Sequence, residues 1–195
     1  FWNFMPKEAK AAYTELLNDG SVLGNAARQR IWVINVNGFG LHDEVEKDVQ
    51  DYQKTVKSTV DDRFGAFSGV NFVTARYKRE GEHQKVVDMI NTELDRLSFK
   101  GAYRSFLLPI RSFESYQQVG AADKIAKRMA KIRDGLKTTL KDRKENAPEK
   151  DFMHTQYCSS VQGMLTAVTE KLGYEQINKE FEDIITQIDE FVSSR

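Results

Sequence analysis

The sequence predicts an α/β protein in which a mainly parallel sheet forms the centre and a layer of three helices follows it. Three observations lead to this prediction. Short β-branched or aromatic runs alternate with amphipathic stretches between residues 31 and 116, those stretches have helical spacing, and only helical patterns follow Ser112. The order strand, helix, strand, helix, strand is typical of right-handed crossover units, and a ferredoxin-like sheet is the alternative that uses similar pieces.

The first expected element is a short helix from Pro6 to Leu17. Proline near the first turn is typical of a helix start, and Gly20 provides a stop. A polar segment then leads to the first expected strand, Ile31–Val36, which is followed by Gly38. Its near-continuous apolar run is typical of a strand that is buried on both faces.

Helices and strands are then expected to alternate. Apolar residues three or four positions apart predict a helix that begins near Asp43; they are Val45, Val49, Tyr52, Val56 and Val60. The run Val70–Ala75 is the second expected strand. A second helix is indicated by the spacing of Val87, Ile90, Leu94 and Leu97. The third expected strand is Ala102–Leu108, which Pro109 stops.

Three further apolar stripes predict three C-terminal helices. The stripes are Ile125, Met129, Ile132, Leu136 and Leu140; Val161, Met164, Leu165, Val168 and Leu172; and Ile177, Phe181, Ile184, Ile188 and Phe191. Pro148 and Gly173 mark the expected breaks between them. The chain therefore divides into an N-terminal helix and linker (1–30), an α/β core (31–116) and a C-terminal helical region packed on that core (117–195).

Composition excludes several classes of protein. The 195 residues carry 29 Lys plus Arg and 29 Asp plus Glu, so the chain is not a bulk polycation. A single cysteine, Cys158, excludes a disulfide framework and a multi-thiolate zinc site within the chain, and it fits a reducing, cytoplasmic location. No apolar run approaches the roughly 18 to 20 residues that span a bilayer. Neither a metal site nor a catalytic residue is assigned.

A ligand site is expected at the carboxyl ends of the strands, where the crevice of an open parallel sheet lies. The residues that three loops would bring there are Asn37, Gly38, Gly40, Asp43, Arg76, Lys78, Arg79 and Arg111. Glycines let backbone amides approach an anion, and arginines neutralise a phosphate. The sequence therefore allows a nucleotide or phosphorylated ligand, with Mg²⁺ near Asp43 as its companion. On the alternative interpretation, the glycines only turn the chain and Asp43 caps a helix.

Charge is unevenly distributed in the C-terminal region. Residues 123–150 carry ten basic and five acidic side chains, a net of +5, whereas residues 170–190 carry two and seven, a net of −5. A basic face able to meet phosphates or an acidic protein surface is expected off the apolar stripe, at Lys124, Lys127, Arg128 and Lys131. The two blocks could also neutralise each other as neighbouring helices. No aromatic residue lies among these cations, which disfavours a platform for stacked bases.

These features support three hypotheses of function. The first is a non-catalytic binding module of a larger intracellular protein or assembly, whose partner is a protein or the remainder of a longer chain. The second is a domain that binds a nucleotide or a phosphorylated ligand at the strand ends, with enzymatic activity left open. The third is electrostatic binding of nucleic acid through the basic helix 123–144.

Overall fold

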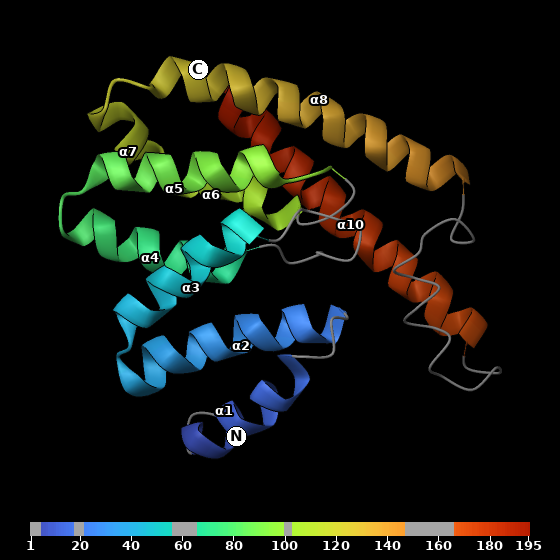
Figure 1. The fold of residues 1–195 in the computed structure, drawn as a ribbon. Helices are drawn as coiled ribbons and strands as arrows, with labels where there is room; N and C mark the ends of the chain where they lie inside the picture. Colours follow the sequence, from blue (N-terminus) through green and yellow to red (C-terminus); the bar gives the residue numbers. More distant parts are fainter. Residues whose placement is uncertain (1–4, 18–21, 56–65, 100–102, 147–165) are drawn as a thin grey trace. The chain divides into compact units, whose positions relative to one another are not determined.

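The computed structural model describes residues 5–17, 22–55, 66–99, 103–146 and 166–195. All regular secondary structure in these ranges is helical, and they contain no strand (Figure 1). The predicted α/β class is therefore wrong, and the described part of the chain is an all-α protein. The chain divides into two compact units, residues 1–122 and 123–195.

The first unit contains five longer helices and three short elements. The longer ones are α1 (Pro6–Leu16), α2 (Val22–Phe39), α3 (His42–Thr55), α4 (Phe67–Arg79) and α5 (His83–Arg96). The short ones are the 3₁₀ helix η2 (Tyr103–Leu107), α6 (Leu108–Arg111) and α7 (Phe113–Gln118). The second unit contains α8 (Ala122–Asn146), whose first residue belongs to the first unit, and α10 (Thr166–Ser193).

The described residues of all three predicted strands are helical. The run Ile31–Val36 belongs to α2, Val70–Ala75 belongs to α4, and residues 103–108 of the third run form η2 and the start of α6. Pro109 lies in the first turn of α6, where a missing backbone N–H costs nothing, so it does not stop a strand.

The apolar run of α2 misled the prediction because this helix is buried on more than one side. Helix α2 packs against α1, α3 and α4, so apolar residues occupy most of its circumference. A short apolar run of this kind cannot be distinguished from a buried strand by its periodicity. In α4, by contrast, the buried residues Val70, Val73, Thr74 and Tyr77 have helical spacing.

The helices expected from amphipathic spacing are confirmed. They correspond to α1, α3, α5, α8 and the C-terminal half of α10. The expected break at Gly173 is wrong, because α10 continues through it from Thr166 to Ser193. Glycine inside a helix costs only about 1 kcal/mol relative to alanine, which tertiary packing can offset. Val56, Val60, Pro148, Gly20 and residues 161–165 lie outside the described residues.

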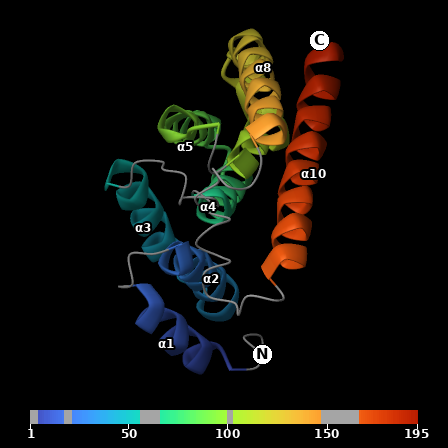
Figure 2. The same cartoon turned by 90° about the vertical axis from the view of Figure 1, so that its right-hand side faces the viewer.

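The core of the first unit is centred on Trp32, which is fully buried. Its ring meets Tyr52 of α3 edge to face at 5.6 Å, and its Nε1 donates a hydrogen bond of 2.6 Å to Asp48. Gly69 lies against the same indole ring, because a side chain there would overlap both Trp32 and Val49. Helix α1 lies along α2 on the far side from this core contact (Figure 2). These contacts join α2, α3 and α4 into one packed group.

The second unit is an antiparallel pair of helices. Asp189 of α10 pairs with Arg133 at 3.3 Å and with Lys137 at 2.7 Å, and Glu182 pairs with Lys144. Residue numbers thus fall along α10 as they rise along α8. Buried apolar residues line one side of each helix, including Met129 and Leu136 on α8.

The three-part division of the chain at residues 30 and 116 stays a prediction, except that an α/β character for residues 31–116 is excluded by the helices found there. None of the described helices is both long enough and apolar enough to cross a membrane.

Candidate functional site

The predicted ligand-binding residues all lie in the first unit, although no strand ends hold them. Asn37 and Gly38 lie in the last turn of α2, Gly40 follows it, and Asp43 lies in the first turn of α3. The cations come later in the chain, with Arg76, Lys78 and Arg79 in the last turn of α4 and Arg111 at the end of α6. Their role in binding a ligand stays a prediction, and their geometry decides how well it is supported.

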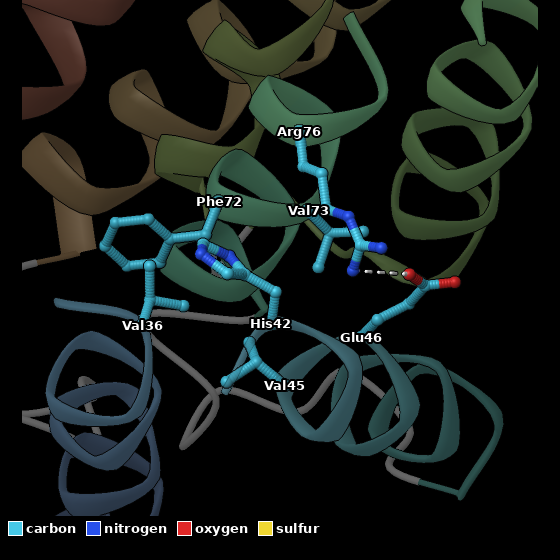
Figure 3. Close-up of a pocket in the computed structure, with 7 residues that line it drawn as sticks. All are labelled: Val36, His42, Val45, Glu46, Phe72, Val73 and Arg76. Carbon is cyan, nitrogen blue, oxygen red and sulfur yellow. Dashed lines mark ion pairs between the residues drawn. The ribbon is translucent and has the colours of Figure 1, made fainter. Parts of the chain in front are cut away.

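Arg76 is surrounded by carboxylates. Its guanidinium forms a short ion pair with Asp43, donates a hydrogen bond of 2.9 Å to Glu80, and lies 3.9 Å from Glu46 (Figure 3). The hydrogen bond and charge of Arg76 lower the pKa of Asp43, and the hydrogen bonds to Asp43 and Glu80 in turn raise the pKa of Arg76. Three carboxylates against one guanidinium make this place net negative, so it repels a phosphate.

Tyr77 extends this group of charges. Its hydroxyl donates a hydrogen bond to Glu46, and burial, then this bond, raise the pKa of Tyr77. The ammonium of Lys85 lies 5.5 Å from the centre of the Tyr77 ring. Glu46 therefore already accepts a hydrogen bond from α4, and the group joins α3, α4 and α5 rather than facing an open site.

A shallow hollow lies beside Arg76. Its apolar lining comes from α2, α3 and α4, and His42, Glu46 and Arg76 complete it; the apolar residues are Val36, Val45, Phe72 and Val73 (Figure 3). The hollow encloses no space as large as a water molecule. Pockets for small molecules and cofactors hold about 300–1,000 Å³. The hollow therefore does not fit a nucleotide.

The glycines near the start of α3 serve the fold. Gly40 has φ +66°, a conformation that glycine adopts without strain, and its N–H donates to Val36 O at 3.1 Å. The amide of Leu41 donates to Asn35 O at 2.9 Å. A Cβ on Gly38 would lie 3.1 Å from Cβ of Pro6, so this glycine allows α1 to approach α2. The Gly40 amide therefore already donates its hydrogen bond to the last turn of α2.

Lys78 and Arg111 form a second, separate contact. The ammonium of Lys78 donates to the backbone carbonyl of Arg111 at 3.2 Å, and the Arg111 guanidinium lies 5.1 Å from the centre of the Phe67 ring. Residues two apart on a helix point to different sides, so Lys78 and Arg76 do not face each other. The structure therefore brings Asp43 to Arg76 and Lys78 to Arg111, but it does not gather the four around one point.

Three of the four residues of the predicted basic face of α8 are exposed. Lys124, Lys127 and Lys131 form no ion pair among the described residues, and Arg128 beside them is partly buried and has an interaction of its own. The acidic residues of α10 pair instead with another row of α8 cations, at Arg133, Lys137 and Lys144. The expected neutralisation of the two charge blocks is therefore real but leaves three lysines unmatched.

Sequence reasoning missed a buried ion pair. Glu93 is fully buried and accepts hydrogen bonds from Nη2 and Nε of Arg96, at 2.9 and 3.1 Å. It also accepts hydrogen bonds from Gln53 Nε2 at 3.1 Å, Ala66 N–H at 2.9 Å and Ser105 Oγ at 3.3 Å. The sequence feature that could have indicated this pair is the position of Glu93, three residues after Ile90 and therefore on the apolar side of its helix. With its oxygens so occupied, Glu93 is a structural group and not a general base.

One pair of side chains has the composition of a catalytic dyad. Nδ1 of His83 lies 3.1 Å from Oγ of Ser115. Ser115 is fully buried, so no substrate carbonyl can approach its hydroxyl, and the contact instead joins α5 to α7. Across the described ranges, no three His, Cys, Asp or Glu side chains lie together as a metal site would need.

Comparison with models of protein families, with curated proteins and with solved structures found no match to this chain.

Proposed function

We propose that this chain is a non-catalytic protein-binding module that works in the cytoplasm as part of a larger assembly. The observation that carries the proposal is the pairing of Arg76 with Asp43, Glu46 and Glu80 beside a hollow that has no room for a ligand. Asp43 and Arg76, two of the residues that would have bound a nucleotide, are engaged with each other. The single cysteine in 195 residues fits a reducing compartment.

The exposed helix surfaces support the same proposal. Lysines remain unmatched on α8, and the described apolar side chains with the largest exposed fractions, Met5 at 41%, Leu16 at 40% and Phe99 at 37%, are scattered. Single exposed apolar residues are ordinary for a protein surface and do not form a groove for a small molecule. The surfaces that this chain offers are helix faces, which other proteins recognise readily.

A thermal-unfolding panel tests the proposal, with nucleotides, sugar phosphates and divalent cations each added to the whole chain. A ligand present at 100 times its Kd stabilises a protein by about 2.7 kcal/mol. At this chain length that corresponds to a rise in Tm of roughly 5–10 °C. We expect no such rise for any member of the panel. A rise that one nucleotide causes, and that Arg76→Ala removes, contradicts the proposal and restores the ligand-site hypothesis.

A further inference from the structure

Three lysines on α8 form an exposed row, which we call the basic face: Lys124, Lys127 and Lys131. They are three and four residues apart, so they lie on the same side of the helix. At a rise of about 1.5 Å per residue, the row is roughly 10 Å long. None of the three forms an ion pair among the described residues.

The rest of α8 shows that this lack of partners is specific to the row. Arg133, Lys137 and Lys144 each pair with an acidic side chain of α10. Lys141 lies 3.8 Å from Glu145 on its own helix. The acidic side chains of α10 therefore pair with the side of α8 that faces α10 and not with the basic face. The three lysines thus carry charge that no acidic side chain of the described residues matches.

Acidic residues at both ends of the row restrict the kind of partner that can bind it. Asp123 precedes Lys124 and Asp134 follows Lys131 by three residues, and both acids are exposed. Asp134 forms its ion pair with Arg133. A continuous phosphate backbone that passed over the three lysines would meet these two carboxylates and be repelled. A short acidic segment can match the row without reaching beyond it.

The chemistry of the row also favours a protein over nucleic acid. Lysine offers a point charge and not the planar fork with which arginine holds phosphates, and no aromatic side chain lies between the three lysines to stack a base. Carboxylates on a helix recur at the same three- and four-residue spacing as the lysines. The two rows can therefore lie side by side in register.

We propose that the basic face of α8 binds an acidic helical segment of a partner protein. This inference rests on the proposed function and names the chemistry of the partner. Exposed charge pairs of this kind set orientation and speed of association more than final affinity, and their effect falls as salt rises.

The test uses as its probe a fluorescently labelled, alanine-rich helical peptide that carries glutamates three and four residues apart along one face. Its binding to the whole chain is measured by fluorescence anisotropy at low and high salt. The first variant carries Lys124→Glu, Lys127→Glu and Lys131→Glu. Its matched control carries Lys47→Glu, Lys54→Glu and Lys179→Glu, three exposed lysines elsewhere that form no ion pair within the described ranges. Both variants change the formal net charge equally, so a difference between them reports the place of the charge.

We expect the wild-type chain to bind the acidic helical peptide at low salt and release it at high salt. We expect the basic-face variant to bind on the order of tenfold more weakly than the control. Equal losses in the two variants, or no binding by the wild type at low salt, overturn the inference. The same measurement with duplex DNA tests nucleic acid as the partner. If the wild type binds DNA more tightly than the acidic probe, and the basic-face variant loses that binding, this face is a nucleic-acid site instead.

A second variant keeps the test valid if charge reversal disturbs α8. Lys124→Gln, Lys127→Gln and Lys131→Gln remove the charge without adding like-charge repulsion, and far-UV circular dichroism checks that helix content is kept. The two proposals also fail separately. A nucleotide that raises Tm contradicts the proposed function, whereas equal losses in the two triple variants overturn only the assignment of this face.

Discussion

Gly69 is the residue at which α4 comes closest to its neighbours. A Cβ at this position would lie 2.3 Å from Cγ2 of Val49 and 2.7 Å from Cε3 of Trp32. Both neighbours are fully buried. The approach of three helices therefore depends on the missing side chain.

Gly69→Ala should destabilise the protein by about 1–3 kcal/mol, the usual cost of overpacking a core, even though alanine favours helix formation. The midpoint of urea unfolding, followed by circular dichroism, measures this cost. Ser68→Ala is the control, since Ser68 contributes its backbone N–H, not its side chain, to the hydrogen bond with Gln29. We expect the control to lie within about 0.5 kcal/mol of the wild type. Equal stability of Gly69→Ala and wild type would contradict the close packing.

Glu93 holds together segments that are far apart in the sequence. It accepts hydrogen bonds from Gln53 at the end of α3, from the backbone of Ala66 before α4, from Ser105 in η2, and from Arg96 on its own helix. The side chain of Arg96 is only 6% exposed, so both charges of this pair are removed from water. Such a pair is costly to break from one side, because the remaining charge is left buried.

Glu93→Gln keeps the shape of the side chain and removes its charge. We expect a loss of about 3–5 kcal/mol in the free energy of unfolding, because the Arg96 guanidinium loses its counter-ion. The same urea titration measures it. The exposed pair of Glu80 with Arg76 provides the comparison, and Glu80→Gln should cost less than about 1 kcal/mol. If both substitutions cost the same, Glu93 does not have the structural role assigned to it.

At the scale of elements, α8 and α10 form their antiparallel pair through one row of charges. Asp189 accepts contacts from both Lys137 and Arg133, which lie one turn apart on α8. The hydrogen bond and charge of Lys137, followed by those of Arg133, lower the pKa of Asp189. A carboxyl whose pKa is lower in the folded state stabilises the protein above its unfolded pKa of about 3.9, and this contribution is lost as pH falls through the folded value.

Asp189→Asn should therefore lower stability at neutral pH and have no effect in acid. Since the Asp189 side chain is 37% exposed, we expect a difference of less than about 1 kcal/mol at pH near 7. The difference between wild type and variant should shrink as pH falls from about 3.9 through the lower folded pKa of Asp189. Thermal unfolding at a series of pH values measures it. Asp183→Asn on the same helix is the control, because Asp183 is exposed and forms no ion pair with any described residue. A difference that grows in acid contradicts the assignment.

Helix α2 shows why an element can be misread from sequence. Its residues Ile31, Trp32, Ile34 and Asn35 are all buried, because α1, α3 and α4 surround it. No polar face interrupts the apolar run, so the 3.6-residue period that marks an amphipathic helix is absent. In α3 and α5, which keep an exposed side, the period is visible and the prediction of a helix is confirmed.

At the scale of the whole molecule, the formal net charge of zero conceals an uneven distribution. Helix α8 carries nine basic and four acidic side chains, whereas α10 carries two basic and seven acidic ones. The sequence predicted these opposite blocks. It did not predict which charges pair, because that choice depends on the side of α8 against which α10 lies.

The candidate ligand site was predicted from a sheet whose strand ends would meet. The described ranges contain no strand, so that reason for grouping its residues is absent. The sequence placed Asp43 and Arg76 near each other for a reason that is wrong, the meeting of strand ends. They do meet, as an ion pair between α3 and α4. The pairing engages both charges within the protein, and their role in binding a ligand stays a prediction.

The sequence by itself determined the amphipathic helices and the exposed basic face of α8, because a helix with one buried side shows its period in the order of its residues. Only the tertiary structure decided that residues 31–36, 70–75 and 103–107 are helical, that Glu93 and Arg96 form a buried pair, and that Arg76 is engaged by carboxylates. The reason is physical. The burial of α2 on several sides, and contacts between residues far apart in the chain, arise from packing and leave no periodic mark on the local sequence.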